Sequence, residues 1–566
     1  MKKITIFILF TFGLSPIFAQ ESNDKGQFSG NFQTNTQFYL NDDDINTNTT
    51  QYQKELSSTD AWLFLNYQIK GFKFSARYDV FNNSPLLNPT GDAFTDHGIG
   101  FWQIRKEIDD LDITIGSFYD QFGSGAAFRA FEERLLGLDY AIEGIRLIYR
   151  PTDNMQLKGF TGRQKGDLGS QDRFNTSPEV VKGLNIENRF NLTDNIPLDL
   201  GASWVNRTLT QEHSMGNIVS IVNGYDLQDR FVPKYNTYVY NGYANLGLGD
   251  FNLKGEYNYK TAEANLVQDA SNNINLRSVD GTLYSTGLSY SKRRIGAKKK
   301  ASIGINVQYR YMKNFIFRTN PLDNFQNGLL SYTPALTREN SYTLLARYNG
   351  NAQTQGEQGF QGDVVFTPRK GTTINANYST INSLEANGKN GKAVHLYREA
   401  YLDVTRKMSK RLKLKLGLQS VIYNQDIYEQ KGGVDNVKTF TPFGEVNYVL
   451  NKKKKKNLRF EFQYLKTKQD LGSFTSTILE YTIAPKWSFA LGDMINIDPQ
   501  GRKDGVLTTL ADKVLHFPRV YVGYTKNTST FSLAYIKQVE GINCTGGVCR
   551  QEPAFSGVRF SLSTSF

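Results

Sequence analysis

The sequence predicts an all-β fold, a large antiparallel transmembrane β-barrel of about 24–26 strands with short periplasmic turns and long external loops. Three observations indicate this class. The chain opens on a segment typical of secretory signal peptides, it then alternates apolar and polar residues over many short stretches, and its last stretch ends on an aromatic residue, Phe566.

The amino-terminal segment starts with two lysines after the first methionine, continues through an apolar run from Ile4 to Phe12, and has a small-residue exit that ends at Ala19. This pattern predicts a signal peptide over residues 1–19 and a mature barrel over residues 20–566. A retained anchor helix is the alternative, but glycine, serine and proline interrupt the run before the roughly 20 residues of a helical span. Export sets the localisation that we expect, the outer membrane of a Gram-negative bacterium.

Composition favours one barrel over several soluble domains. The chain holds 38 Phe, 32 Tyr and 49 Gly, which suits aromatic girdles and strands joined by hairpins. Its mean hydropathy of −0.47 resembles that of a soluble protein, but lipid-facing and lumen-facing residues alternate in barrels and cancel in the average. No linker or low-complexity tract divides the chain after residue 27.

Strand signals of period two recur along the mature chain, with one face apolar and aromatic and the other polar or small. The clearest cases are residues 303–311, 412–418, 458–464 and 531–535. We count about 25 segments, and because single-chain bacterial barrels have even strand numbers, one is missed or invented. The weakest stretch is Phe315 to Asn340, where pattern and turn signals disagree.

The connections between these segments alternate in length. Short turns are expected at residues 69–72, 109–112, 151–155, 248–251 and 368–372. Long polar loops are expected at residues 41–60, 82–98, 166–183, 209–234, 262–281 and 382–392. Outer-membrane barrels pair short periplasmic turns with longer external loops, so we expect both chain termini in the periplasm.

The formal net charge of +12 would suit nucleic acid, but an exported protein does not meet nucleic acid as a routine partner. The basic residues gather in short connections between strands. They are Lys292-Arg293-Arg294, Lys298-Lys299-Lys300, Lys407 with Lys410-Arg411, and Lys452 to Lys456. Two interpretations stay open: solvated turns, or a docking surface for anionic partners.

The last segment carries Phe560, Leu562 and Phe566 on one alternation. A final strand that closes on an aromatic resembles the signature that bacterial barrel-assembly machinery recognises, so Phe566 is a candidate assembly signal. An ordinary buried last strand is the alternative. Membrane lipids and lipopolysaccharide are the other partners that a barrel implies.

Cys544 and Cys549 lie in the last predicted external loop, on either side of two glycines. Because the compartment is oxidising, a local disulfide is expected. A metal site is disfavoured because a structural site wants about four ligands and no histidine is near. Asp42-Asp43-Asp44 lacks the spacing of a calcium loop, so we expect a solvated tip there and no metal or cofactor.

Four isolated histidines, at 97, 213, 395 and 516, are the only candidates for hydrolytic chemistry. A barrel hydrolase needs a histidine beside a hydroxyl or carboxylate, and no local motif proposes a nucleophile. We therefore predict that the protein is not an enzyme.

The most distinctive segment runs from Ile115 to Pro151, with a predicted connection from Phe122 to Tyr140 between two strands. Its glycines 123, 125, 137 and 144 permit positive φ or close backbone approach. Its charged residues are Arg129, Glu132, Glu133, Arg134, Asp139 and Arg146. The connection either folds into the lumen as a charged constriction or forms paired bridges that tie it to the wall and block the barrel.

This segment, together with Tyr342 to Tyr348, Gln355 to Gln361 and Phe366 to Thr372, resembles an uncharacterised outer-membrane barrel family of Bacteroidota, a domain of unknown function. The resemblance implies a location and a fold and brings no catalytic residues. Some Bacteroidota barrels of unknown role accompany the barrel-assembly complex or the type IX secretion translocon, and the resemblance admits that association here.

Three functions follow as hypotheses. The first is a non-enzymatic structural or accessory subunit of such an envelope complex. The second is a passive porin-like channel for small polar solutes, gated by the connection from Phe122 to Tyr140. The third is an outer-membrane hydrolase. TonB-dependent import is disfavoured because strand-like sequence begins near Phe28 and leaves no room for an amino-terminal plug domain.

Overall fold

The structure is a computed structural model, and it describes most of the chain after residue 25. The described residues are 26–47, 51–86, 93–166, 173–268, 274–296, 300–323, 326–384, 392–499, 513–545 and 548–566. The predicted signal peptide, residues 1–19, lies outside them.

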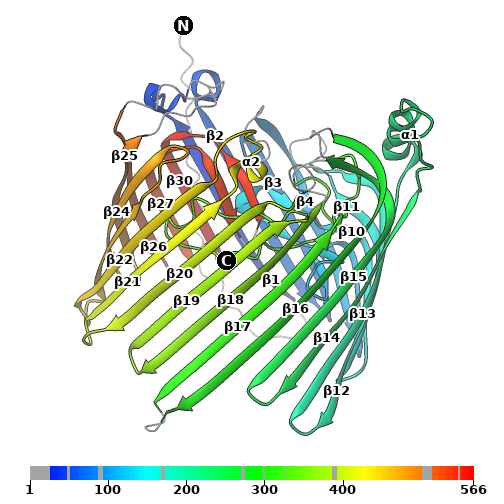
Figure 1. Ribbon diagram of the computed structural model, residues 1–566, viewed down its shortest axis with the longest axis horizontal. Helices are drawn as coiled ribbons and strands as arrows, with labels where there is room; N and C mark the ends of the chain where they lie inside the picture. Colours follow the sequence, from blue (N-terminus) through cyan, green and yellow to red (C-terminus); the bar gives the residue numbers. More distant parts are fainter. Residues whose placement is uncertain are drawn as a thin grey trace.

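The wall of the molecule is one antiparallel sheet of 24 strands that closes on itself (Figure 1). Its first half contains β1 (Gln27–Tyr39), β2 (Ser57–Ile69), β3 (Phe72–Ser84), β4 (Phe94–Ile108), β5 (Leu111–Phe118), β10 (Ile142–Thr152), β11 (Met155–Lys165), β12 (Thr176–Thr193), β13 (Ile196–Thr208), β14 (Asn236–Leu248), β15 (Phe251–Gln268) and β16 (Ile274–Ile295). The second half contains β17 (Ala301–Lys313), β18 (Gly356–Arg369), β19 (Thr372–Ser383), β20 (His395–Lys407), β21 (Leu412–Tyr423), β22 (Val437–Asn451), β23 (Lys456–Leu465), β24 (Gly472–Ile483), β25 (Trp487–Pro499), β26 (Leu515–Lys526), β27 (Ser529–Gln538) and β30 (Phe555–Ser565). The predicted β-barrel fold is confirmed.

The barrel closes between its first and last strands. β1 pairs with β30 from Asn31 opposite Ser565 to Tyr39 opposite Gly557. Beyond this register the backbone of Phe566 still pairs with Gly30, through hydrogen bonds of 2.8 and 3.0 Å. We call the contact of β1 with β30 the seam.

The wall has 24 strands, one fewer than the roughly 25 strand segments predicted from sequence, because one predicted segment is not a wall strand. The described part of Phe315 to Asn340 forms no wall strand, and its backbone makes only an isolated bridge between Arg318 and Leu329. The whole stretch from residue 314 to residue 355 connects β17 to β18. Its alternation is too irregular to offer a continuous lipid-facing side, which a wall strand needs.

All five predicted short turns are confirmed, each at one end of the barrel. The turns at residues 70–71, 109–110, 153–154, 249–250 and 370–371 each leave two residues between consecutive strands. The described residues of the basic runs also lie at this end. Lys300, Lys410, Arg411 and Lys452 to Lys455 are in the predicted connections, whereas Lys292 to Arg294 belong to the end of β16, Lys407 is the last residue of β20 and Lys456 is the first residue of β23. Lys298 and Lys299 lie outside the described residues. We call this end of the barrel the short-turn end.

Three predicted long loops are wrong in their bounds. The loop predicted over residues 82–98 contains the end of β3 and the start of β4 at Phe94. β12 already begins at Thr176, and β15 and β16 run to Gln268 and from Ile274, so most of the predicted loop over residues 262–281 is strand. These hairpins extend past the apolar zone, where the outer face of a strand is polar and the alternation that marks a lipid-facing strand disappears. Sequence pattern therefore underestimates how far these strands continue.

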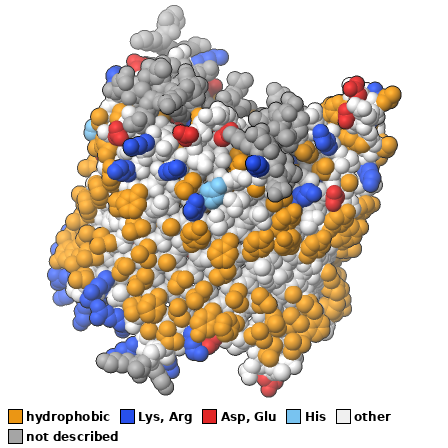
Figure 2. Space-filling model, viewed as in Figure 1, with side chains coloured by type: hydrophobic (Ala, Val, Ile, Leu, Met, Phe, Trp, Pro, Cys, Tyr) orange, Lys and Arg blue, Asp and Glu red, His pale blue; other side chains and the backbone are white. Residues whose placement is uncertain are grey.

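Outward positions of the wall carry exposed large apolar side chains, and on the face that Figure 2 shows they form a broad apolar belt across the barrel. Examples are Tyr257, Leu416 and Leu533, each more than half exposed. Exposed apolar surface on this scale is stable in lipid and not in water. The belt and the closed wall define a membrane-spanning barrel.

Short elements lie in the connections. They are the 3-10 helices Asp43–Ile45 and Arg134–Leu136, the π-helical turns Gln51–Glu55 and Gln211–Met215, helices α1 (Gly216–Asn223) and α2 (Gln425–Tyr428), and strands β6 (Asp120–Phe122), β7 (Phe128–Ala130), β8 (Glu132–Glu133), β9 (Leu138–Asp139), β28 (Gly541–Thr545) and β29 (Val548–Glu552). No helix in the described ranges has the length and apolarity of a membrane span.

Candidate functional site

The connection between β5 and β10, residues 119–141, folds against the inner side of the wall, and we call it the first inner segment. Its strands pair as β6 with β7 and β8 with β9, so its backbone groups find partners away from the wall. Phe122 and Phe128 are fully buried against Phe160 of β11, with ring centroids 5.7 and 4.5 Å away. This packing anchors the segment beside β10 to β12.

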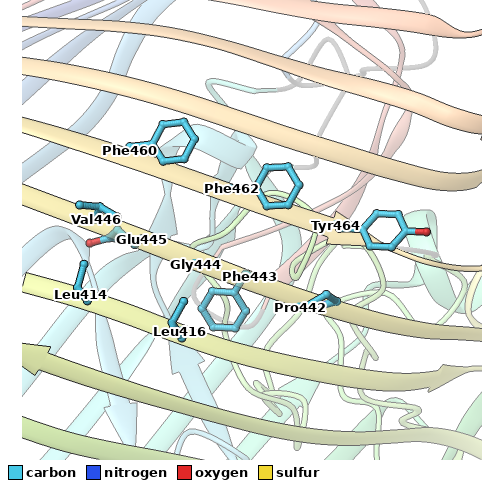
Figure 3. A pocket seen from close by; sticks show the side chains of 10 residues that line it. All are labelled: Leu414, Leu416, Pro442, Phe443, Gly444, Glu445, Val446, Phe460, Phe462 and Tyr464. Carbon is cyan, nitrogen blue, oxygen red and sulfur yellow. The ribbon is translucent and has the colours of Figure 1, made fainter.

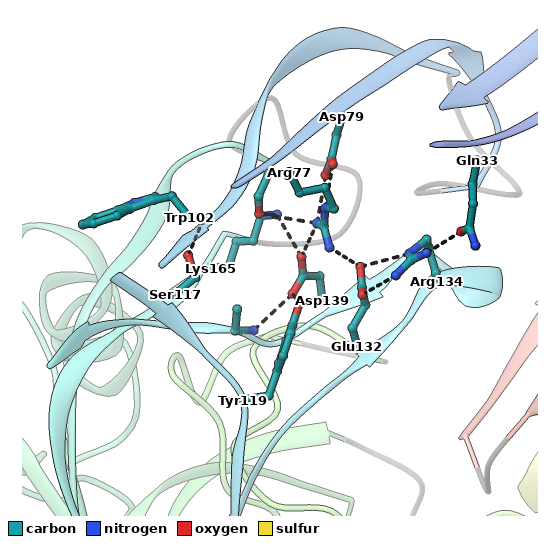
Figure 4. Close-up of polar contacts among 12 residues, drawn as sticks. Gln33, Arg77, Asp79, Trp102, Ser117, Tyr119, Glu132, Arg134, Asp139 and Lys165 are labelled. Carbon is teal, nitrogen blue, oxygen red and sulfur yellow. Dashed lines mark hydrogen bonds and ion pairs between the residues drawn. The ribbon is translucent and has the colours of Figure 1, made fainter. Parts of the chain in front are cut away.

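A buried ion-pair network ties the first inner segment to β3 and β11 (Figure 4). Arg77 of β3 bonds Asp79 of the same strand through Nε, at 2.6 Å, and Asp139 of β9 through Nη2, at 2.8 Å. Its Nη1 pairs with Glu132. Because Arg77, Asp79 and Asp139 are at most 1% exposed, each charge depends on the others for stabilisation.

Asp139 is the centre of this network. It also accepts from Lys165 Nζ of β11 at 2.8 Å and from Tyr119 Oη at 2.9 Å. Burial raises the pKa of Asp139, but Lys165 and Arg77 outweigh burial and hold the pKa of this carboxyl below its ordinary value. Asp139 is therefore ionised at neutral pH.

Glu132 extends the network toward the seam. Arg134 donates from Nη2 to Glu132 Oε2 at 2.9 Å and from Nη1 to Gln33 of β1. Its guanidinium also lies over the Phe64 ring of β2, 4.6 Å from the centroid. Glu133, one residue before Arg134, is half-buried and makes no ion pair with a described residue.

Arg146 belongs to the wall strand β10 and reaches the base of the first inner segment. It donates from Nη1 to the Tyr119 carbonyl at 3.1 Å and to Asp120 Oδ2 at 3.3 Å. Lys158 of β11 binds the other oxygen of Asp120 at 3.0 Å. Two wall cations therefore hold one loop carboxylate.

Residues 314–355 form a second inner segment, which contacts the first. The Arg129 amide donates to the Leu330 carbonyl at 2.9 Å, and the Arg129 guanidinium lies 4.1 Å from the centroid of the Tyr332 ring. Phe315 and Phe317 are fully buried in one apolar cluster with Phe128. The two segments therefore pack as one body, which we call the inner body.

The second inner segment continues across the opposite half of the wall. Tyr342 Oη donates to Glu445 of β22 at 3.0 Å, and the Leu344 amide donates to Gln463 of β23 at 2.8 Å. Tyr348 is buried and donates to Asp470 at 3.0 Å. Contacts of the inner body thus extend from β1, at Gln33, to β26, where Arg519 Nη2 donates to Thr343 Oγ1 at 3.4 Å.

Three of the four predicted glycines have positive φ within the first inner segment. The φ angles of Gly123, Gly125 and Gly137 are 53°, 97° and 70°. Gly144 lies instead in β10, where a Cβ would be 2.1 Å from the Thr161 carbonyl oxygen of β11. Close approach of the two strands therefore excludes a side chain there.

A polar strip of the wall lies on both sides of the seam, where the inner body contacts it at Gln33 through Arg134 and leaves a gap farther along. Its residues are Asn31, Gln33, Asn35 and Gln37 of β1, Ser561, Ser563 and Ser565 of β30, and Thr530 and Ser532 of β27, which face one another in register. The residues between them on β27, Phe531 and Leu533, face outward and are exposed. All members of the strip are short or uncharged.

A cavity of about 990 Å³ lies between this strip and the inner body. Asn35, Ser532 and Ser561 line it from the wall, and Arg134 and Thr343 line it from the inner segments. Arg559 of β30 also contributes, with its Nε 3.1 Å from Gln37 Oε1. Polar walls of this kind hold water.

The histidines lie far apart in the fold, and two of them contact carboxylates. His213 Nδ1 lies 3.0 Å from Glu179 Oε1 and 3.1 Å from Ser214 Oγ, while His516 Nδ1 lies 2.6 Å from Asp493. Ser214 is completely buried and donates its hydroxyl proton to Glu179, so it offers no nucleophile to a substrate. The described residues contain no cluster of three potential metal ligands.

Cys544 of β28 and Cys549 of β29 are directly opposite in the ladder of that hairpin. Their side chains lie outside the described part of the structure, and the disulfide stays a prediction. Opposite residues of an antiparallel pair have Cα atoms about 4.5–5.5 Å apart, within the range that a disulfide spans.

Sequence reasoning missed the wall partners of the first inner segment. Arg77 and Asp79 share the inner face of β3, on either side of the exposed Tyr78, so an inward-facing charged pair was the available signal. Lys165 offered no such sequence signal, because a single polar residue is ordinary on a strand of alternating pattern. Sequence reasoning missed the polar strip for the same reason, because its residues are ordinary polar positions of alternating strands.

The closed antiparallel wall, the apolar belt and the inner body define a β-barrel of the outer-membrane type. The chain belongs to the family of unknown function DUF6029, whose family model matches residues 1–566. A search of curated proteins finds no sequence that matches.

Solved structures with a similar fold are outer-membrane barrels of low sequence identity. A chain of the Escherichia coli P pilus tip assembly intermediate PapC-PapD-PapK-PapG has a TM-score of 0.46 and 11% identity; the match covers 95% of this chain and 60% of that one. The siderophore receptor PirA of Pseudomonas aeruginosa has a TM-score of 0.42 and 10% sequence identity, and the match covers 97% of this chain and 81% of that one. OccAB3 of Acinetobacter baumannii has a TM-score of 0.37 and 9% sequence identity, and the match covers 96% of this chain and 99% of that one.

Proposed function

We propose that this protein is a narrow channel of the outer membrane, through which small polar solutes diffuse along the polar strip at the seam. The observation that carries the proposal is the cavity of about 990 Å³ between that strip and the inner body. The short-turn end then faces the periplasm, as it does in other barrels, and both ends of the barrel chain lie there.

The division of the lumen supports this function. The inner body buries its aromatic residues against β10 to β24 and covers that arc of the wall with apolar packing. The seam arc instead presents Asn, Gln, Ser and Thr side chains, whose hydrogen-bonding groups replace part of the hydration of a polar solute. Such a surface suits passage better than tight binding.

Charges beside the strip set the selectivity. Arg134 and Arg559 approach the cavity from the inner body and from β30, and Asp60 of β2 lines the same cavity. Arg347 and three further carboxylates, those of Glu339, Glu540 and Glu552, line the same cavity. Cations and carboxylates around one narrow passage orient dipolar or zwitterionic solutes across it. We therefore propose small polar solutes without a large net charge as the permeants.

Planar-bilayer recording of the purified barrel tests the function. Stable conductance steps are expected, smaller than those of an open barrel of this strand number because the inner body narrows the lumen. A barrel that inserts and gives no steps contradicts the channel. Insertion is established separately by the heat-dependent shift in gel mobility that folded barrels show.

A structural subunit of a larger envelope complex, such as the barrel-assembly or type IX secretion machinery, is the second candidate. The observation that favours it is the inner body itself, which is held by the buried network of Arg77 and Asp139 and fills much of the lumen. Affinity purification after mild detergent extraction tests it. Recovery of the protein alone, at its monomer mass, contradicts this role.

A further inference from the structure

The charges at the short-turn end are divided between two arcs. In four of the five turns from β2 to β15 the turn residues are acidic: Asp109 and Asp110, Asp153, Asp194 and Asp250. In five of the six turns from β16 to β27 they are basic, and in the sixth, Asn527-Thr528, the preceding strand β26 ends on Lys526. The exposed basic residues, which we call the basic arc, are Arg293, Arg294, Lys300, Arg369, Lys370, Lys407, Lys410, Arg411, Lys452 to Lys455, Lys486 and Lys526.

The basic arc is not neutralised by the protein. The turns that carry it contain no Asp or Glu, and within the described part of the chain none of its side chains forms an ion pair. Lys292, at its border, pairs with Asp250 of the acidic arc at 2.7 Å. Lys and Arg side chains gather along the lower edge of the barrel, below the apolar belt, in Figure 2. An uncompensated patch of this extent attracts anions.

The basic arc lies at the depth of lipid headgroups. Trp487 follows Lys486 directly, and its ring lies 4.5 Å from that of Tyr524, two residues before Lys526. Paired Trp and Tyr side chains on the outer face mark the interface between the hydrocarbon core and water. The turns of the arc are short, so their charges stay beside this girdle.

Above the centre of the basic arc, the outer wall contains an apolar furrow of about 540 Å³ (Figure 3). Its floor is Pro442 and Gly444 of β22, and a Cβ on Gly444 would lie only 3.1 Å from Leu416 Cδ2. Its sides are Leu416 of β21 and Phe462 of β23, which flank Gly444 in register. The furrow therefore follows one strand between two ridges of larger side chains.

The furrow and the basic arc share the same strands. Val446 lies at the lower end of the furrow, and the hairpin of β22 and β23 reaches its turn at Lys452. At about 3.4 Å per residue and a tilt of roughly 40°, Val446 is about 15 Å above the turn and Gly444 about 20 Å, so the furrow begins at about half of the hydrocarbon thickness. A lipid with its headgroup at the turn extends its chain to this depth.

We propose that this region binds an anionic phospholipid, with the phosphate on Lys452 to Lys455 and the neighbouring Lys410 and Arg411, and an acyl chain in the furrow at Gly444. An acidic periplasmic protein would use the basic arc but would leave the furrow empty. An anionic lipid contacts both features, because its phosphate pairs with the basic arc and its acyl chain fills the furrow. Its negative charge matches the basic arc and not the acidic arc. The site does not depend on whether the lumen conducts.

Native mass spectrometry of the detergent-purified barrel tests the site. The barrel is mixed with equal amounts of phosphatidylglycerol and phosphatidylethanolamine that carry the same acyl chains. We expect the phosphatidylglycerol adduct to exceed the phosphatidylethanolamine adduct about fivefold, a modest value for several lysines at a membrane surface. Equal adducts overturn the proposal and favour an acidic protein partner.

Two variants separate the two features. Replacing all four residues Lys452 to Lys455 with Gln is expected to abolish the headgroup preference. Gly444→Leu is expected to lower retention of both lipids at least twofold, because it fills the furrow while the charges stay. Retention of the full preference by the four-lysine variant, or of full lipid binding by Gly444→Leu, overturns the proposal.

Matched controls exist on the acidic arc. Gly255 faces outward on β15 with open space around it, so Gly255→Leu adds the same side chain to the lipid face without filling a furrow. Asp153→Asn and Asp194→Asn change charge at the same end. None of these is expected to alter the ratio of the two lipids. The heat-dependent gel shift verifies that every variant is folded before its adducts are compared.

Discussion

Arg77 and Asp139 are 62 residues apart in sequence, and their side chains form a buried hydrogen bond of 2.8 Å between the wall and the first inner segment. Arg77 is an inward-facing residue of the wall strand β3, and Asp139 belongs to the loop that connects β5 to β10 inside the barrel. The lumen of this barrel is therefore organised by electrostatic ties to specific wall positions.

Removal of the central carboxylate should loosen the inner body. Asp139→Asn leaves Arg77 and Lys165 buried with one less negative partner, which we expect to cost about 3–5 kcal/mol of folding stability. Thermal unfolding in detergent, followed by intrinsic fluorescence, measures the loss. Glu133→Gln is the control, because Glu133 is half-exposed and makes no ion pair with the described residues. Equal stability of the two variants would show that the network is dispensable.

Obstruction of the polar strip should reduce conductance. Ser561→Trp places a large ring in the cavity, and we expect the unit conductance to fall at least twofold because the passage follows that strip. Leu562→Trp, one residue along β30, points to lipid and is expected to leave the conductance unchanged. Bilayer recordings of the two variants under identical salt settle the comparison. The strip is not the path if both conduct like the parent.

Closure at the seam should depend on the absence of a side chain at residue 30. A Cβ on Gly30 would lie 2.4 Å from the Phe566 ring, so Gly30→Ala is expected to cost about 1–3 kcal/mol and to lower the folded fraction. Phe566→Ala in the same chain should restore much of it by removing the clash. The folded fraction after refolding is read from gel mobility. Gly255→Ala, in open space, serves as the control, and absence of rescue would contradict the clash.

The predicted bond between Cys544 and Cys549 can be tested by alkylation. Iodoacetamide under denaturing conditions should add no groups to the unreduced protein and two groups after reduction, because the opposed positions in the hairpin suit a disulfide. Mass spectrometry of the intact chain counts the groups. Labelling of both thiols without reductant would exclude the disulfide.

The wall could be predicted from sequence because its information is local. Each strand shows its lipid-facing side through alternation, as at residues 412–418, and each short turn falls where the alternation breaks, as at residues 69–72. Lipid imposes that alternation on every strand separately, so no knowledge of neighbours is needed. Strand ends beyond the belt, such as that of β15, lack the constraint and were misplaced.

The lumen could not be predicted in the same way. The charged residues of the first inner segment were visible, but their partners Arg77 and Lys165 lie on different strands, and the contact of Arg129 with Tyr332 joins two loops. Such contacts are specified by three-dimensional proximity and have no period in sequence. Local alternation therefore accounts for the barrel, whereas the inner body, the cavity and the polar strip exist only because closure brings distant inward-facing residues together.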